Sequence, residues 1–557
     1  MAFFKAIATV GGFTLASRLL GFIRDVLMAS FLGAGPVADA FFIALKLPNF
    51  FRRITAEGAF SISFVPMFSK VLAEDGKAEA GKFAEEAQAV MLAVLLPFTI
   101  VCIVAMPWVL YVIAPGVHCN FTAQPQCDPA RLDLAVAFSR ITFPYILMMS
   151  LTALLGGVLN SFGRFAAFAA APMFFNGILI IALLFGTKLF QTSGHALAWG
   201  LAAAGVAQFV WMLVNYKMLG YALKLRRPAL TPRIRKLFRL MIPGAVGAGA
   251  AQINLFIDMI LASLLPVGSI SFLYYADRLY QLPLGVIGVA IGTALLPMLS
   301  QALKSKNGDA QKLLGLGFET ALVLSLPAGI ALVVIAGPIM SVLFERGAFT
   351  HHDSLQSSYA LMAYAIGLPA YVLARVFSTA YFAREDTATP VKFAIICAVI
   401  NTVLALALIG PLQHVGIALA TGITAWINLA LLMVSLHRKK HLDLPINSVK
   451  RAAGIVISGF LMAALLWAMN VYFTMVGPQA MVMLTGADGV GRPGCSQGAI
   501  GEIGVLQLAL MIGAGGASYF ACLYGFGIFN VQSIKALFPK RQKQDTLEGI
   551  KGDVGCE

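Results

Sequence analysis

Ten ionisable side chains are embedded in long apolar stretches of this sequence, where charged groups are costly and seldom face lipid. Six are cations and four are acids, so two positive charges are left over. Such a surplus in a low-dielectric cleft is expensive unless an anion enters, and arginine suits phosphate because its planar guanidinium donates two parallel hydrogen bonds. The set therefore predicts a site for a diphosphate. The cations are Arg18, Arg24, Lys46, Arg52, Arg53 and Arg278, and the acids are Asp25, Asp39, Glu57 and Asp277.

The spacing of these residues indicates which helices must hold them. In the apolar stretch at 36–69, Asp39, Lys46 and Arg53 are seven residues apart and line one side of a helix. Asn49 lies three residues beyond Lys46 on the same side. This helix is expected to present a polar face to a cleft.

The stretch before it, at 7–31, repeats the pattern. Arg18 and Asp25 form one ridge of a helix, and Ser17 and Arg24 form the ridge beside it. Arg18 is about 16 Å into this helix, close to the middle of a membrane. The first helix therefore also has a broad polar face.

A simpler interpretation is that opposite charges pair and lock the two halves of the protein together. Arg53 and Glu57 are such a pair, four residues apart, and Asp277 and Arg278 are neighbours in the apolar stretch at 270–300. Long arginine stems could also carry their charges to the membrane surface. Both alternatives would reduce the number of free cations.

A second polar group could bind a cation such as sodium. Its members are separated in sequence but carry the oxygen atoms that hard cations prefer. The alternative is that Asp258 caps a hydrogen-bond network or pairs with Arg140 or Arg375. The candidate ligands are Asn254, Asp258, Asn401 and Thr421.

Cysteine and histidine patterns favour no other metal centre or cofactor. The seven cysteines include no C-x-x-C pair. Cys119 and Cys127 share one external loop, where they could form a disulfide or remain free thiols. His351, His352 and Asp353 resemble metal ligands but are expected to cap a helix outside the membrane.

The composition excludes an ordinary soluble enzyme. Of 557 residues, 59% are apolar and 12% are charged, whereas globular domains carry about a quarter charged residues. Segments of about 20 apolar residues, long enough to span a membrane, recur from end to end. We expect an all-α polytopic membrane protein with about fourteen spans, near 7–31, 36–69, 85–114, 131–160, 165–187, 196–216, 239–265, 270–300, 313–343, 355–382, 390–410, 414–436, 451–476 and 504–528.

The distribution of basic residues sets the orientation. The net charge of +15 does not indicate a nucleic-acid partner, because the excess lies in alternate loops. The loop after the sixth span alone holds eight basic residues between Lys217 and Arg239. By the positive-inside rule, this pattern predicts an even number of spans and both termini in the cytoplasm.

An internal repeat divides the chain. Four matches occur in the same order about six spans apart, so the halves share one orientation, with a pseudo-two-fold axis along the membrane normal and a substrate site between them. They relate Arg24–Leu32 to Ile257–Leu265, Pro66–Leu72 to Pro297–Leu303, Pro144 to Pro369 and Asn176 to Asn401.

The repeat predicts two six-helix lobes followed by an added pair of helices. The predicted parts are an N-terminal lobe at 1–225, a C-terminal lobe at 226–445, a helix pair at 446–530 with an external loop at 477–503, and a cytoplasmic tail at 531–557.

Several segments resemble the MurJ (MviN) family of lipid II flippases, within the multidrug, oligosaccharidyl-lipid and polysaccharide exporter superfamily. The resemblance is close over roughly residues 1–450 and loose over the last two spans. The matching runs are S-R-L-L-G-F-I-R-D from Ser17, A-D-A-F-F-I-A-L-K-L-P-N-F-F-R-R-I-T-A-E-G-A-F from Ala38, F-P-Y-I-L from Phe143, G-V-L-N-S-F-G-R-F from Gly157, Y-Y-A-D-R-L from Tyr274 and T-P-V-K-F-A-I from Thr389.

The resemblance implies a transporter of the bacterial inner membrane that carries lipid II, an undecaprenyl-diphosphate-linked disaccharide-pentapeptide, to the outer leaflet by alternating access. It implies a central cavity, and a groove for the lipid tail on the last two helices. It also implies that arginines in this cavity bind the diphosphate. Those arginines are Arg18, Arg24, Arg52 and Arg278, with Asp39, Lys46, Glu57 and Asp277 as supporting charges.

The sequence departs from the family at three places. Gln281 stands where some relatives carry an acid, so the role of that acid is in doubt here. Ala405, one turn past Asn401, leaves the sodium site without a further carboxylate. The external segment from Gly477 to Glu502 is longer than expected.

Other transporters and other classes remain as alternatives. An exporter of a different lipid-linked polysaccharide would differ only in its cargo, and a cation-coupled drug exporter would need acidic rather than basic cavity residues. A membrane glycosyltransferase or phosphatase would need a catalytic carboxylate or histidine set, which we do not find. A scaffold of the cell-wall synthesis machinery would leave the buried charges unexplained. Ion coupling or the membrane potential could drive transport.

Overall fold

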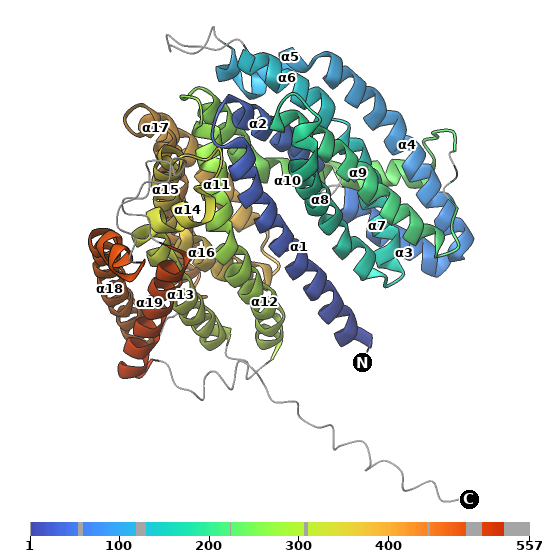
Figure 1. Cartoon of the computed structure of the whole chain (residues 1–557). Helices are drawn as coiled ribbons and strands as arrows, with labels where there is room; N and C mark the ends of the chain where they lie inside the picture. Colours follow the sequence, from blue (N-terminus) through green and yellow to red (C-terminus); the bar gives the residue numbers. More distant parts are fainter. Residues whose placement is uncertain are drawn as a thin grey trace, which may run out of the picture.

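The computed structural model describes residues 2–53, 60–118, 130–222, 224, 226–305, 310–442, 446–485 and 504–528. These ranges are almost entirely helical and contain no strand (Figure 1). Glu57, Cys119, Cys127, residues 486–503 of the predicted external loop and the predicted tail at 531–557 lie outside the described residues. The first part of that predicted loop, 477–485, is instead the end of a helix that runs from Ile446 to Thr485. The predicted all-α class is confirmed.

The first half of the chain forms one group of helices. Proline begins several of them, as Pro36 does for α2, because a first-turn proline gives up no helical hydrogen bond. The elements are α1 (Ala2–Leu32), α2 (Pro36–Arg52), α3 (Ser61–Glu74), α4 (Gly76–Val104), α5 (Met106–Ile113), η2 (Pro115–Val117), α6 (Ala130–Thr142), α7 (Tyr145–Ser161), α8 (Phe165–Phe185), η3 (Gly186–Lys188) and α9 (Ser193–Lys217).

The second half forms a similar group, followed by two more helices. At the start of α15, the Thr350 hydroxyl accepts from the Asp353 amide and the Asp353 carboxylate accepts from the Thr350 amide, so this segment caps a helix, as expected. The elements are α10 (Pro232–Ser263), α11 (Ser269–Pro283), η4 (Leu284–Gly288), α12 (Val289–Lys304), α13 (Ala310–Val334), α14 (Ala336–Phe344), α15 (His351–Ile366), α16 (Leu368–Phe382), α17 (Ala388–Arg438), α18 (Ile446–Thr485) and α19 (Val505–Gly525).

Helix α17 contains two spans rather than one. Gln413 has a left-handed φ of 49°, which interrupts the helix. A Cβ added to Gly416 would lie 2.5 Å from the Leu408 carbonyl oxygen, although residues eight apart in a straight helix are separated by about 12 Å. The chain therefore turns back on itself here (Figure 1).

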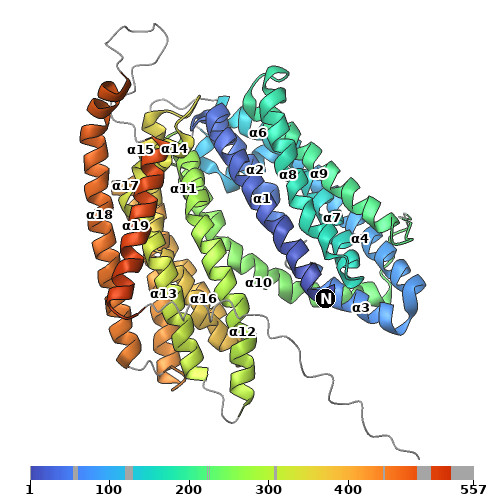
Figure 2. The ribbon, with the colours of Figure 1, turned by 60° about the horizontal axis from the view of Figure 1, so that its bottom comes forward.

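The number of spans agrees with the prediction. Ten helical segments in the described residues are long and apolar enough to cross a membrane, and α17 is one of them. Counting α17 twice, and adding α1, α10 and the α2–α3 pair that lie among the others in Figure 2, accounts for the fourteen predicted spans. The chain is a multi-pass membrane protein.

The two groups lie side by side, with α10 crossing between them and α18 and α19 on the outer edge of the second group (Figure 2). The last two helices are fixed to α13, because Gly459 packs closely on Ile330 and Leu326 and the Tyr519 hydroxyl donates to the Val323 carbonyl. Helix α10 contacts α3, α4 and α5 of the first group as well as α11 and α17 of the second. The lobe boundary near residue 225 stays a prediction.

The two groups meet closely at the end of α1 that is opposite the N-terminus. The Ala348 amide donates to the Ser30 carbonyl over 2.8 Å. Gly33 and Gly347, both with left-handed φ, bring the backbones so near that an added Cβ would lie 2.4 Å from the opposite carbonyl oxygen. We call this region the closed end; from it, α1 and α12 diverge in Figure 2.

Candidate functional site

Asp39 joins the two groups at the closed end. Its carboxylate accepts hydrogen bonds from the Gly268 amide (2.8 Å), the Ser271 amide (3.0 Å) and the Ser271 hydroxyl (2.6 Å), which together cap α11. The Arg131 guanidinium of α6 lies 3.2 Å away and forms an ion pair with the same carboxylate. Both charges are buried and each has its partner, so this pair is a fixed joint between α2, α6 and α11.

Arg24 and Asp25 form a second buried pair on α1. Nε and Nη2 of Arg24 donate to Oδ1 of Asp25 over 3.0 and 2.6 Å, and Nη1 donates to Oδ1 of Asn176 over 2.9 Å. Asn176 in turn donates to the carbonyl of Ser17, and the Tyr274 hydroxyl of α11 donates to Asp25. Arg24 is therefore largely occupied by groups of the protein itself.

Arg278 lies beside this pair and forms no ion pair with any acid among the described residues. Its guanidinium carbon is 4.6 Å from the centre of the Tyr274 ring, a cation–π contact, and its buried Nε has no hydrogen-bond partner. The neighbouring carboxylate of Asp277 accepts from the side chain of Gln281 instead. Gln281 therefore holds Asp277, and Arg278 keeps spare hydrogen-bond donors.

Arg52 is the last residue of α2, and Arg53 follows it as the C-cap. Nε of Arg52 donates to Asn49 over 3.2 Å, and Nη1 of Arg53 donates to Gln252 of α10 over 3.4 Å. The predicted pair of Arg53 with Glu57 involves an undescribed residue. Arg52 and Arg53 thus lie where α2 faces the crossing helix.

Arg18 and Lys46 complete the predicted set. Arg18 is exposed and Lys46 half-buried, and neither forms an ion pair with any described residue. The guanidinium of Arg18 approaches η4, the segment that follows α11. A Cβ added to Gly285 of η4 would lie 2.8 Å from Nη1 of Arg18. Together with Arg278 of the second group, these two residues of the first group are cations that have no acid partner in the part of the chain that the structure describes.

The structure therefore divides the predicted residues into two kinds. Asp39 and the Arg24–Asp25 pair have their charges satisfied within the protein, whereas Arg18, Lys46 and Arg278 form no ion pair with the described residues. The sequence pattern did not identify Arg131, which lies in the first turn of α6. A fully buried Asp39 needs a cation, and this requirement was the signal that could have found it.

The sodium candidates are only partly brought together. Asn401 donates to Asp258 over 3.3 Å, and the buried Oδ1 atoms of Asn254 and Asn401 have no partner. The Thr421 hydroxyl bonds to the Ile417 carbonyl of its own helix. Neither arginine considered as a partner of Asp258 forms an ion pair with it. Three oxygen-bearing side chains from α10 and α17, those of Asn254, Asp258 and Asn401, thus remain candidates for a cation site.

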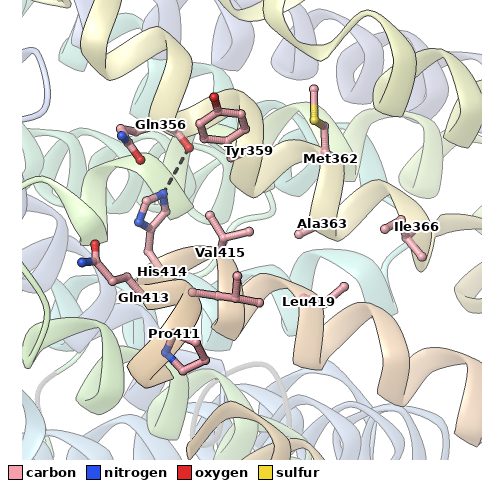
Figure 3. A pocket seen from close by; sticks show the side chains of 11 residues that line it. Gln356, Tyr359, Met362, Ala363, Ile366, Pro411, Gln413, His414, Val415 and Leu419 are labelled. Atoms are coloured by element: carbon pink, nitrogen blue, oxygen red, sulfur yellow. Dashed lines mark hydrogen bonds between the residues drawn. The ribbon is translucent and has the colours of Figure 1, made fainter. Parts of the chain in front are cut away.

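A groove of about 560 Å³ lies elsewhere, between α15 and the turn in α17 (Figure 3). Its lining includes Tyr359, Met362 and Leu419, and Nε2 of His414 lies 3.1 Å from the Gln356 carbonyl oxygen. None of the predicted site residues lines it. The groove and the charge cluster are separate features.

Comparisons with known proteins agree with this architecture. A family model described as "Lipid II flippase MurJ" matches residues 28–485. The chain is 41% identical over 553 residues to a probable lipid II flippase MurJ of Rhizobium meliloti strain 1021, covering 98% of both chains. It is 35% identical over 445 residues to the lipid II flippase MurJ of Burkholderia cenocepacia, covering 79% of this chain and 84% of that one.

Solved structures show the same fold. One of a lipid II flippase MurJ in an inward closed conformation has a TM-score of 0.74 and 25% identity, and covers 93% of this chain and 98% of its own. An inward-facing multidrug resistance transporter of the MATE family has a TM-score of 0.64 at 13% identity, covering 78% of this chain and 98% of its own. The chain belongs to the MurJ family of lipid II flippases.

Proposed function

We propose that this protein carries lipid II from the cytoplasmic to the outer leaflet of the inner membrane, and that its unpaired cations bind the diphosphate. Family membership supports the cargo. The single observation that carries the binding mode is that Arg18, Lys46 and Arg278 come from both lobes and have no acid partner among the described residues. A diphosphate would neutralise them. A carrier of cationic drugs would need the opposite charge.

The paired residues have a different task in this proposal. Asp25 holds Arg24 and the Tyr274 hydroxyl together, and Tyr274 lies under Arg278. The pair therefore positions the face on which Arg278 is displayed. Arg24 and Arg52 also contribute donors to the diphosphate once it displaces weaker contacts.

Transport then requires the closed end to open. Asp39 has to release the Gly268 and Ser271 amides, so that α2 and α11 can separate. A substrate can drive this change only by binding the open state more tightly than the closed state. A diphosphate that draws Arg18 and Arg278 together would bind the open state more tightly. It would neutralise two cations that have no ion pair with the described residues in the empty protein.

Two energy sources are compatible with this cycle. The empty carrier is cationic, and moving one charge through 100 mV contributes about 2.3 kcal/mol, so an inside-negative potential would reset it when both termini are cytoplasmic. Sodium bound between Asp258, Asn254 and Asn401 would act through the second lobe instead. Transport that is unchanged after collapse of the potential would remove the first source.

The last two helices and the cell-wall synthesis machinery complete the proposal. Helices α18 and α19 pack on α13 at the edge of the second lobe, where they would guide the undecaprenyl tail beside the protein. Enzymes that use externalised lipid II are the expected partners. The membrane lipids around these helices would share the same surface.

The experiment measures lipid II head groups on the outer face of cells whose sole flippase is this protein. At matched membrane levels, Arg18→Ala, Lys46→Ala and Arg278→Ala should each lower externalised lipid II by on the order of tenfold or more, the effect of one lost charged hydrogen bond. Arg140→Ala is the control, because that exposed arginine donates to the Ile103 carbonyl away from the cluster.

Full activity of all three variants would show that the cations are not used to bind the substrate. No externalised lipid II with the unaltered protein would refute the cargo itself. Equal loss in Arg140→Ala would indicate a general effect of removing intramembrane arginines.

A further inference from the structure

Arg375 on α16 is an intramembrane arginine that the function proposed above does not use. The sequence made it a possible partner for Asp258, but Asp258 accepts from Asn401 instead. Arg375 is exposed and forms no ion pair or hydrogen bond with the described residues. A charge in this position needs an explanation, because ionisable groups inside a membrane usually line a path for a substrate or an ion.

The side chain of Arg375 lies along a glycine-lined face of the neighbouring helix. A Cβ added to Gly292 of α12 would touch Cγ and Cδ of Arg375 at 3.4 Å, and one added to Gly288 would lie 3.8 Å from Nη1. Nothing else lies within 4 Å of the added Cβ at Gly292. The aliphatic stem therefore rests on bare backbone, and the guanidinium is carried toward η4.

Arg18 reaches the same segment from the other lobe. Its Nη1 lies 2.8 Å from a Cβ added to Gly285, one turn before Gly288. Side-chain positions three residues apart on a helix are separated by about 5–6 Å. The two guanidinium groups are therefore within roughly 12 Å of each other across η4, and short π-helical segments such as η4 are frequent at functional sites.

We propose that Arg18 and Arg375 form a two-arginine site across η4 that receives the diphosphate of the substrate before it reaches Arg278. This inference rests on the proposed function and adds a binding position to it. Gly285 is seven residues beyond Arg278, about 10 Å further along the helix, toward the end that the basic loops predict to be cytoplasmic. A diphosphate that enters from the cytoplasm therefore meets this pair before it meets Arg278.

The pair also suits a loading position because its two members come from different lobes. Each arginine can donate two parallel hydrogen bonds to a phosphate, and neither has to leave a protein carboxylate to do so. Arg24, by contrast, would have to loosen its bonds to Asp25 and Asn176. Binding at the Arg18–Arg375 site therefore costs the protein no internal ion pair.

The test measures binding of lipid II and of undecaprenyl diphosphate to the full chain in phosphatidylcholine nanodiscs. Arg375→Ala should weaken both ligands by on the order of tenfold or more, and Arg375→Lys should restore part of the affinity because the charge remains. Arg18→Ala with Arg375→Ala should lose less than the product of the single losses, since the two residues share one ligand.

Gly292→Leu tests the geometry without removing the charge. The added side chain would occupy the place of the Arg375 stem and should weaken binding of both ligands, but it should have no further effect in Arg375→Ala. Thermal unfolding of each variant shows that the fold is intact, and Arg140→Ala should bind both ligands as the unaltered protein does.

Three outcomes would overturn the inference. Unchanged binding of both ligands to Arg375→Ala would show that the arginine only extends to the membrane surface. A loss confined to lipid II would place a peptide carboxylate, not the diphosphate, on Arg375. If the unaltered chain binds neither ligand, both this site and the proposed function fail, whereas normal binding with an ineffective Arg375→Ala refutes the site alone.

Discussion

Asp25 and Asp258 occupy matching places in the sequence repeat, each on the first helix of its half. The asparagines that the repeat also matches bond nearby: Asn176 bonds to Arg24, the neighbour of Asp25, and Asn401 bonds to Asp258 itself. In the first lobe, Arg24 precedes Asp25 and neutralises it, and Asn176 accepts from the same arginine. In the second lobe, Ile257 takes the place of the arginine, and Asp258 is contacted by Asn401 without an ion pair.

We infer from this difference that the two matching sites have different tasks. In the first lobe, the Asp25 carboxylate pairs with Arg24, so it is not available to a cation. It also accepts from Tyr274, the residue on which Arg278 lies. In the second lobe, the carboxylate of Asp258 is bonded by Asn401 and lies one helical turn from Asn254, and the Oδ1 atoms of both asparagines have no partner among the described residues. A carboxylate with amide oxygens is a set that a small hard cation can use.

Replacement of the two aspartates should give the largest difference in stability between the two lobes. Asp25→Asn leaves the buried Arg24 guanidinium without its counter-charge, and removal of one partner of a buried pair costs about 3–5 kcal/mol. Asp258→Asn leaves no orphaned cation and should cost less than about 1 kcal/mol in sodium-free buffer. The midpoint of thermal unfolding in detergent measures both, and equal losses would contradict the proposed difference between the lobes.

The sodium dependence of stability sharpens the comparison from the other side. Sodium chloride, compared with choline chloride at equal ionic strength, should stabilise the unaltered protein by about 2.7 kcal/mol at a concentration one hundred times the dissociation constant. Asp258→Asn and Ile257→Arg should abolish this effect, the second by rebuilding the Arg24–Asp25 arrangement in the second lobe. A sodium effect that survives in both variants would place the ion elsewhere.

The fold could be predicted because the number and order of membrane spans depend on stretches of neighbouring residues. A span needs about 20 apolar residues, and the basic loops between spans confirm the count without any knowledge of contacts. The repeat was equally informative, because it matched Asn176 with Asn401 before the structure showed that both contact the first helix of their halves. The break in α17 fell at the predicted boundary between two spans.

The division of charges within the site could not be predicted in the same way. Asp39 is satisfied by Arg131 and by the start of α11, 92 and 229 residues away in the chain, and helical spacing carries no information on such contacts. Arg24 and Arg18 lie on adjoining ridges of the same predicted polar face, yet Arg24 is buried in bonds to Asp25 and Asn176 and Arg18 is exposed. The net charge of the set predicted that some cations have no acid partner, but which cations these are depends on how the lobes pack together.

The smallest expected effects come from the two matched asparagines, and they test the comparison in detail. Asn176 accepts from Arg24 and donates to the Ser17 carbonyl, so Asn176→Ala should cost about 1–3 kcal/mol through an unsatisfied buried arginine donor. Asn401 makes one bond of 3.3 Å and leaves Oδ1 without a partner, so Asn401→Ala should cost less than about 1 kcal/mol in choline chloride.

In sodium chloride the same Asn401→Ala variant should fall further behind the unaltered protein, because it then also loses a ligand of the ion. Asn176→Ala should show the same deficit in both salts, measured again by thermal unfolding. A salt-dependent loss in Asn176→Ala, or a salt-independent one in Asn401→Ala, would mean that the two lobes use their asparagines alike and that the missing arginine before Asp258 has no functional consequence.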